Sequence, residues 1–173
     1  EDVFKLMDNL NIPKAHFVGG SFGATLIREM QELCPEKFIS VVAAGGVLRL
    51  SPLFYLALNS AKILAPYINN YLLYEIMAYI IMPRKNHAKS RQLFLNISKS
   101  VPPDEFTSWI VVISEVKHKL DEIYNKPFSS PTLLINGSED YAFLMDCIRF
   151  CKINPCTQME IMPHCGHLSN IDK

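Results

Sequence analysis

The sequence predicts an α/β domain in which helices flank a parallel sheet and a helical segment is inserted between two of the strands. Short apolar runs alternate with helical patterns near both ends of the chain, which is typical of parallel strands joined by helices. The middle of the chain shows helical periodicity alone. With 173 residues, of which 49% are hydrophobic, the chain has enough apolar material for the core of one globular domain.

Residues 1–47 are expected to form the first part of the α/β core. The chain opens on a helix that ends near residues 11–13, and its predicted apolar face consists of Val3, Leu6, Met7 and Leu10. A short apolar strand follows over residues 15–18, and a second strand over residues 39–44 ends at two glycines. The helical pattern between these strands is carried by Leu26, Ile27, Met30 and Leu33.

Residues 48–126 are expected to form the inserted segment. Aromatic and long aliphatic side chains dominate it, and their spacing is helical throughout. Proline-containing breaks at Pro66, at residues 83–86 and at residues 102–104 divide it. We therefore expect several helices and no strand.

Residues 127–173 are expected to complete the core. Residues 132–135 and 158–162 predict two further strands, and residues 141–151 predict the helix that joins them. The residues available to cap another helix after the last strand are Ser169 and Asn170.

The charge and hydropathy of the chain exclude two classes of partner. The 17 basic residues balance the 17 acidic residues to a formal net charge of zero, so the positive surface that binds nucleic acid is not expected. The most apolar stretch, residues 53–82, is interrupted by polar residues and proline. No stretch reaches the roughly 18 uninterrupted apolar residues of a membrane span.

The first residues lack the basic and apolar regions of a secretory signal. The chain has five cysteines, an odd number that favours free thiols over a disulfide framework. Together these observations predict a cytoplasmic location.

Residues 19–23, GGSFG, match the pattern G-x-S-x-G between a predicted strand and a predicted helix. A serine on such a sharp turn has a strained backbone and projects its hydroxyl out of the sheet. The start of the helix also places free N–H groups beside a developing oxyanion. The alternative is a glycine-rich turn without chemistry. A nucleotide site is not indicated, because neither G-x-G-x-x-G nor the P-loop pattern occurs.

A serine hydroxyl needs a base, and the base needs an acid to orient it. Asp140 follows the predicted strand over residues 132–135, and His167 follows the next strand. The carboxyl ends of parallel strands lie at one edge of a sheet, so Ser21, Asp140 and His167 are expected to converge there.

The segments around these three residues, 16–24, 131–140 and 161–168, resemble the nucleophile elbow, strand-end acid and late histidine of the α/β-hydrolase fold family. The resemblance implies that Ser21 is the nucleophile, His167 the general base and then acid, and Asp140 the group that orients the imidazole. It also implies that the backbone N–H of Phe22 is one oxyanion donor. Residues 48–126 then resemble the family's variable helical cap.

The sequence departs from the family pattern at its beginning. The second oxyanion donor of the family comes from a His-Gly loop after an early strand, and that loop is absent from this chain. The resemblance therefore implies an N-terminally truncated fold that lacks the first strands. The strand over residues 15–18 would then have an unpaired edge, open to self-association with a second chain.

Other side chains near these residues allow more than one interpretation. Glu139 is expected to be a solvated loop charge, with replacement of Asp140 as the acid as its alternative. His164 is expected to be a turn residue. A structural metal bound by cysteine and histidine is not expected, because no C-x-x-C pair occurs.

The inserted segment offers two candidate binding features. A basic cluster is expected to be a solvated loop, with an anion dock as its alternative, and consists of Arg84, Lys85, Lys89 and Arg91. Apolar side chains that either line an acyl pocket or pack the insertion on the core are Leu53, Phe54, Tyr55, Tyr71, Leu72, Leu73, Tyr74, Tyr79, Phe106 and Trp109.

The sequence thus predicts a serine hydrolase that cleaves a small ester, thioester or amide through an acyl-enzyme, with no cofactor and no metal. The presence of serine rather than aspartate at position 21 argues against the haloalkane and epoxide branches of the family. The GGSFG form also occurs in relatives that remove N-terminal residues from peptides, so a peptidase is one alternative. The other is an inactive fragment or non-catalytic interaction module of the same fold.

Overall fold

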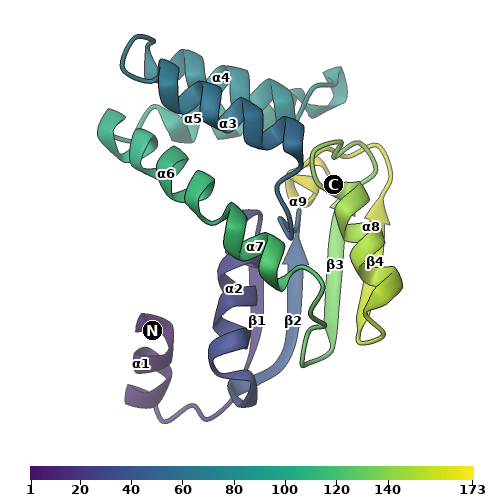
Figure 1. Ribbon diagram of the computed structural model, residues 1–173. Coiled ribbons are helices and arrows are strands. Elements are labelled where there is room, and N and C mark those ends of the chain that lie inside the picture. The colour runs from purple at the N-terminus through teal and green to yellow at the C-terminus, as the bar shows by residue number, and fades with distance from the viewer.

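A computed structural model describes the backbone of residues 1–173 and all side chains except those of Pro103, Asp104 and Phe106. Four parallel strands form one sheet in the order β1-β2-β3-β4 (Figure 1). Their bounds are Ala15–Gly20 for β1, Phe38–Ala44 for β2, Thr132–Gly137 for β3 and Thr157–Met162 for β4. The parallel sheet predicted from the alternation of strands and helices is confirmed.

Four helices belong to this α/β part: α1 (Asp2–Asn9), α2 (Phe22–Leu33), α8 (Leu144–Ile153) and the short α9 (Ser169–Asp172). A 3₁₀ turn, η1 (Pro35–Lys37), leads from α2 into β2. Helix α8 begins three residues later than predicted, because residues 138–143 form a turn. In that turn the N–H of Asp140 donates to the carbonyl of Gly137 at 3.1 Å. The later start of α8 leaves Asp140 in the loop at the end of β3.

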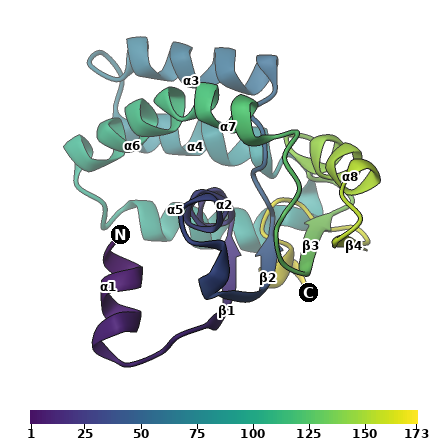
Figure 2. The ribbon, with the colours of Figure 1, turned by 60° about the horizontal axis from the view of Figure 1, so that its bottom comes forward.

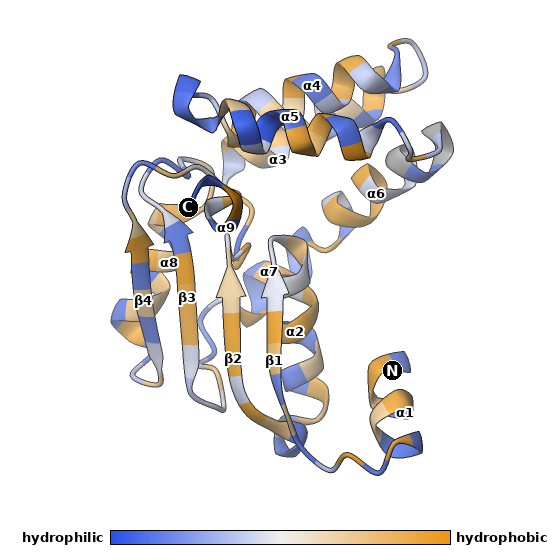
Figure 3. Ribbon diagram, turned by 180° about the vertical axis from the view of Figure 1, so that it is seen from behind, coloured by the Kyte–Doolittle hydropathy of each residue, from blue (hydrophilic) through white to orange (hydrophobic). Residues whose placement is uncertain are grey.

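The two faces of the sheet differ in their cover. Helices α2 and α8 pack on one face. The view from behind looks onto the other face, which is open among the described residues except for the short α9 at the carboxyl ends of the strands (Figure 3). Val18 of β1 is 74% exposed on that open side. Strand β1 is also an edge strand of the described sheet, as expected from the sequence.

The apolar faces predicted for the first two helices are wrong in part. Of the face predicted for α1, only Met7 is buried, together with Phe4. In α2, Leu26 and Leu33 are exposed while Arg28 and Gln31 are buried. The polar groups of Arg28 and Gln31 can be buried because they donate hydrogen bonds to acceptors on the segment that returns from the insertion. Arg28 Nη2 donates to the Lys126 carbonyl at 2.9 Å, and Gln31 Nε2 donates to Ser130 Oγ at 2.7 Å.

The helical insertion lies between β2 and β3 and contains α3 (Pro52–Leu64), α4 (Asn70–Ile81), the 3₁₀ turn η2 (Lys85–His87), α5 (Ala88–Ser98), α6 (Pro103–Glu115) and α7 (Lys117–Ile123). Helices α3 to α6 lie beyond the carboxyl ends of the strands, and α7 leads back toward the sheet (Figures 1 and 2). Side-chain caps start two of them: Ser51 Oγ accepts from Phe54 N, and Asn69 Oδ1 accepts from Tyr71 N.

An apolar cluster joins the helical insertion to the α/β part. It includes Phe54 and Leu58 of α3, Ile123 of α7 and Phe143, which precedes α8. The rings of Phe54 and Phe143 meet edge to face with centroids 4.8 Å apart. The insertion is thereby held over the edge of the sheet where Ser21, Asp140 and His167 lie. Along the part of the chain that the structure describes, no helix is both long and apolar enough to cross a membrane.

Candidate active site

Ser21 lies on the turn between β1 and α2 with φ 51° and ψ −120°, a backbone conformation that is rare for a residue with a side chain. The strain predicted from the G-x-S-x-G pattern is present. A hydrogen bond of 2.8 Å from Ser21 N to the Ala44 carbonyl ties the turn to the end of β2. The strand, the turn and the neighbouring strand therefore fix the position of the Ser21 hydroxyl.

The glycines of the turn have unequal roles. A Cβ on Gly19 would lie 2.8 Å from the backbone carbon of Gly23 and 2.6 Å from the side chain of Ile27. A Cβ on Gly23 would meet nothing within 4 Å. The close approach of α2 to β1 thus requires a glycine at position 19 and not at position 23.

Ser21, His167 and Asp140, which the sequence predicts to converge, form one hydrogen-bonded line. Ser21 Oγ is 2.7 Å from His167 Nε2, and His167 Nδ1 is 2.9 Å from Asp140 Oδ2. The Asp140 side chain is fully buried and that of His167 is 3% exposed. Since an ionised carboxylate only accepts hydrogen bonds, the imidazole proton lies on Nδ1 and donates to Asp140. Nε2 is then free to accept the hydrogen bond of the Ser21 hydroxyl.

Two neighbours fix the orientation of this line. The side-chain amide of Asn136, inside β3, lies 3.5 Å from the same oxygen of Asp140. The Phe143 ring packs against the imidazole of His167 with centroids 5.0 Å apart. The burial of both side chains excludes water from the Asp140 carboxylate, which strengthens its interaction with His167.

The backbone N–H of Phe22 belongs to the first residue of α2. The first N–H groups of a helix have no acceptor within the helix, and they carry the positive end of the helix dipole. The Phe22 side chain packs edge to face on Trp109 of α6 with centroids 6.0 Å apart. This contact places a residue of the helical insertion directly above the turn.

A cavity of about 230 Å³ opens beside Ser21 and His167 under the helical insertion. Its lining is apolar and aromatic apart from Ser21, His167 and Tyr74. The residues that line it are Ser21, Phe22, Val47, Leu50, Phe54, Leu58, Tyr74, Met77, Ile81, Phe94, Trp109, Ile110, Ile113, Phe143 and His167. Among these described residues there is no Asp, Glu, Lys or Arg.

Three of the side chains proposed from the sequence as pocket residues do line this cavity: Phe54, Tyr74 and Trp109. Leu73 is instead buried in a separate apolar cluster of the helical insertion. Four of the proposed pocket side chains are instead exposed by 40% or more: Leu53, Tyr71, Leu72 and Tyr79. Tyr55 lies outside the described lining of the cavity. The side chain of Phe106 lies outside the described residues.

The environment of Glu139 differs from the solvated loop charge that the sequence predicts. Its side chain is only 14% exposed and is bound by the helical insertion, so it is not a solvated loop charge. The hydrogen bond from His167 goes to Asp140, so Glu139 does not take the place of the acid. His164 lies on a turn, as expected, with φ 59°.

Two residues of the insertion, Asn86 and His87, contact Glu139, and no sequence pattern indicated them. The reason is that the partner of His87 lies 52 positions away and no spacing rule links the two. In the basic cluster next to them, Arg84 Nε donates to the Tyr141 hydroxyl at 2.8 Å and Arg91 Nη1 donates to the Arg84 carbonyl at 3.0 Å. Two of the four cations are thus engaged within the protein, and Lys85 and Lys89 are exposed.

The cysteines are free. Burial raises the pKa of the Cys147, Cys151 and Cys165 thiols, so they stay protonated at neutral pH. Among the side chains that the structure describes, no group of three or more His, Cys, Asp or Glu is arranged to hold a metal ion.

Comparison with solved structures identifies the fold. The chain superposes on an α/β hydrolase from a Medee basin deep-sea metagenome library with a TM-score of 0.73 and 20% identity, over 96% of this chain and 63% of that chain. A thermophilic esterase from Thermogutta terrifontis superposes with a TM-score of 0.76 and 18% identity, over 99% of this chain and 64% of that chain. A meta-cleavage product hydrolase from Pseudomonas fluorescens superposes with a TM-score of 0.69 and 21% identity, over 98% of this chain and 64% of that chain.

These likenesses show that the chain has the α/β-hydrolase fold, in a partial form with four parallel strands. The chain spans 63–64% of the length of the three structures. No protein-family model matches the sequence, and no curated protein matches it.

Proposed function

We propose that this chain carries the catalytic centre of a serine hydrolase that cleaves an ester, thioester or amide of a neutral, apolar acyl group through an acyl-enzyme. The observation that carries the proposal is the hydrogen-bonded line from Ser21 through His167 to Asp140, which ends at an apolar cavity. The same order of groups occurs in serine hydrolases of several unrelated folds, where it is recognised by geometry.

In the first half of the reaction, Ser21 Oγ attacks the carbonyl carbon of the substrate while its proton passes to His167 Nε2. The tetrahedral intermediate collapses as the bond to the leaving group breaks, and His167 returns the proton to the leaving oxygen, sulfur or nitrogen. In the second half, water attacks the acyl group on Ser21 and gives a proton to His167. Release of the acid returns that proton to Ser21 Oγ.

Asp140 supports both halves without changing its own protonation state. Its carboxylate holds the proton of His167 on Nδ1, so that Nε2 faces Ser21, and it stabilises the imidazolium that forms. The N–H of Phe22 is the donor proposed for the developing oxyanion, because it lies beside Ser21 at the free start of α2.

The cavity supports an apolar acyl group as the recognised part of the substrate. Its described lining offers no cation to a substrate carboxylate and no carboxylate to a substrate ammonium group. Esters of simple acids are therefore favoured over peptides with a free N-terminus. The likeness to an esterase from Thermogutta terrifontis supports an ester as the bond that is cleaved.

The test is covalent labelling of the chain with a fluorophosphonate probe, beside a Ser21→Ala variant. We expect labelling of the wild-type chain and none of Ser21→Ala. Labelling that persists in Ser21→Ala would refute Ser21 as the nucleophile. Hydrolysis of p-nitrophenyl acetate, butyrate and octanoate and of an aminoacyl p-nitroanilide then separates an esterase from a peptidase. Preference for the anilide would overturn the proposed substrate class.

The competing proposal is a non-catalytic module of the same fold. It requires the same fold but no reactive hydroxyl on Ser21. A correctly folded wild-type chain that neither reacts with the probe nor cleaves any ester would establish this alternative.

A further inference from the structure

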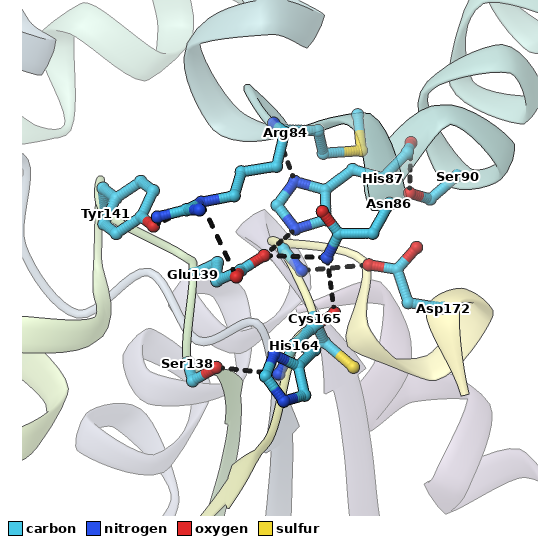
Figure 4. A network of polar contacts seen from close by, with 12 residues as sticks. Arg84, Asn86, His87, Ser90, Ser138, Glu139, Tyr141, His164, Cys165 and Asp172 are labelled. Carbon is cyan, nitrogen blue, oxygen red and sulfur yellow. Dashed lines mark hydrogen bonds and ion pairs between the residues drawn. The ribbon is translucent and has the colours of Figure 1, made fainter.

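A second polar network connects the helical insertion to both loops that carry the acid and the base (Figure 4). Its centre is the carboxylate of Glu139, the residue before Asp140. Glu139 Oε2 accepts a hydrogen bond of 2.8 Å from Asn86 Nδ2 and another of 2.8 Å from His87 Nε2. Arg84 Nε lies 3.6 Å from the other oxygen. Three residues next to or within η2 thus converge on one carboxylate.

The roles of the His87 nitrogens follow from their partners. The backbone N–H of Arg84 lies 3.3 Å from Nδ1, which must therefore accept. Nε2 then carries the proton and donates it to Glu139. The hydrogen bonds from Asn86 and His87 and the charge of Arg84 lower the pKa of the Glu139 carboxyl, so it is an ionised acceptor at neutral pH.

The histidine loop takes part in the same network. Asn86 Nδ2 also donates to the His164 carbonyl at 2.8 Å, so both protons of this amide are used. The fully buried His87 ring packs on Gly166, where a Cβ would lie 2.9 Å from Nδ1. The residue directly before His167 must therefore be glycine for the ring of His87 to fit.

The acid loop and the histidine loop are also tied to each other. The N–H of Glu139 donates to the Cys165 carbonyl at 2.9 Å, and Ser138 Oγ accepts from His164 N at 2.9 Å. Asp140 follows directly on Glu139, and His167 comes two residues after Cys165. A change in the spacing of the two loops would change the 2.9 Å contact between Asp140 and His167.

We propose that Asn86, His87 and Glu139 form a latch that holds the helical insertion on the acid and histidine loops, so that Asp140, His167 and the wall of the cavity keep their relative positions. The proposal rests on the proposed function for the reaction it serves. These three are positioning residues, since none of them lines the cavity or contacts Ser21. Their effect on the reaction comes through geometry, where a displacement of about 1 Å is costly.

The chain contains a built-in reporter of the position of the insertion. Trp109 is its sole tryptophan and lies on α6, against the Phe22 ring of the turn. An insertion that is released from the loops would separate Trp109 from Phe22 and raise the exposure of Trp109 above the 44% that it has with the insertion in place. Quenching of Trp109 fluorescence by acrylamide measures this exposure without any enzymatic activity.

The experiment compares Asn86→Ala, His87→Phe, Glu139→Ala and Glu139→Gln with the wild-type chain. Asn86 is exposed, so its truncation leaves the chain folded even if the buried His87 does not tolerate replacement. The matched controls are His118→Phe and Glu160→Ala, which change exposed residues of the same types away from the latch. The rate of Ser21 labelling by the fluorophosphonate, Trp109 quenching and the melting temperature are measured for each.

We expect the rate of labelling to fall about tenfold in Glu139→Ala and His87→Phe and about threefold in Asn86→Ala, with stronger quenching of Trp109 in all three. Glu139→Gln keeps an acceptor oxygen for His87 and should recover most of the labelling rate. If the three latch residues affected stability alone, the labelling rate and the melting temperature would change together across the variants. The controls should match the wild type.

Two results would overturn the latch: wild-type rates and quenching in the folded Asn86→Ala, His87→Phe and Glu139→Ala variants, or no recovery in Glu139→Gln. If the wild-type chain itself is not labelled, the proposed function fails while the latch is still decided by Trp109. In that case unchanged quenching in the variants would refute it.

Discussion

The loops at the strand ends and the inner wall of the helical insertion meet at the same cavity, but they are built in different ways. At the strand ends, single positions are fixed by backbone strain, close approach and directed hydrogen bonds, as at Ser21, Gly19 and Asp140. The wall of the insertion is a set of apolar side chains, such as Phe54, Leu58 and Trp109, that contribute area and shape. Under the proposed function, the chemistry depends on a few irreplaceable positions, and the choice of substrate depends on many exchangeable ones.

The largest effect is expected from Asp140→Asn. The amide preserves the size of the side chain but does not hold the His167 proton on Nδ1, so kcat for a p-nitrophenyl ester should fall by about 10³–10⁴-fold. Steady-state kinetics measure the loss. Asp8→Asn, an exposed change of the same kind on α1, is the control and should retain full activity. A loss of less than tenfold in Asp140→Asn would show that Asp140 does not orient the base.

The next effect sharpens the contrast within the turn itself. Gly19→Ala places a methyl group against the backbone of Gly23 and should lower the free energy of unfolding by about 1–3 kcal/mol. Gly23→Ala meets open space inside α2 and should be neutral or stabilise by up to about 1 kcal/mol. Urea denaturation of both variants checks the difference. Equal losses would contradict the close approach at Gly19.

A smaller change is expected at the wall of the insertion. Trp109→Leu removes part of an aromatic side chain that is 44% exposed, so the melting temperature should change little. The cavity becomes wider beside Ser21, and kcat/KM for octanoate relative to acetate should rise by up to about tenfold. The ester series measures this ratio. An unchanged ratio would place the acyl group elsewhere.

The smallest effect concerns pH and the network that joins the two regions. Hydrogen bonds from Asn86 and His87 lower the pKa of Glu139 in the folded chain below its ordinary value of 4.5. The carboxylate thus contributes stability above the unfolded pKa, and this contribution is lost as the pH falls through the folded pKa. Between pH 7 and pH 3, the wild-type chain should lose more free energy of unfolding than Glu139→Gln. Urea denaturation at both pH values checks this, and parallel losses would contradict it.

The difference between the two regions also explains what could be predicted. The turn around Ser21 is a local pattern, and the strain and the projected hydroxyl follow from five consecutive residues. Asp140 and His167 were predictable because the carboxyl ends of parallel strands share one edge. By contrast, the burial of Arg28 and Gln31 was not predictable, since their acceptors come from the segment that returns from the helical insertion.

The latch is the clearest case of what sequence patterns do not record. Glu139 has the appearance of a loop charge beside an acid, and its environment is made by Asn86 and His87, more than fifty positions earlier in the chain. Only the packing of the insertion on the two loops brings these groups within hydrogen-bonding distance.

Local residue patterns are enough to predict the parallel α/β arrangement, the helical insertion and the three residues that form the hydrogen-bonded line, because periodicity, turn chemistry and strand-end position are local properties. Three features are visible in the folded chain alone: which apolar side chains line the cavity, which glycine is indispensable and how the insertion is fastened to the loops. Those features depend on distances between segments that are remote in the chain, and such distances are set by packing rather than by local residue patterns.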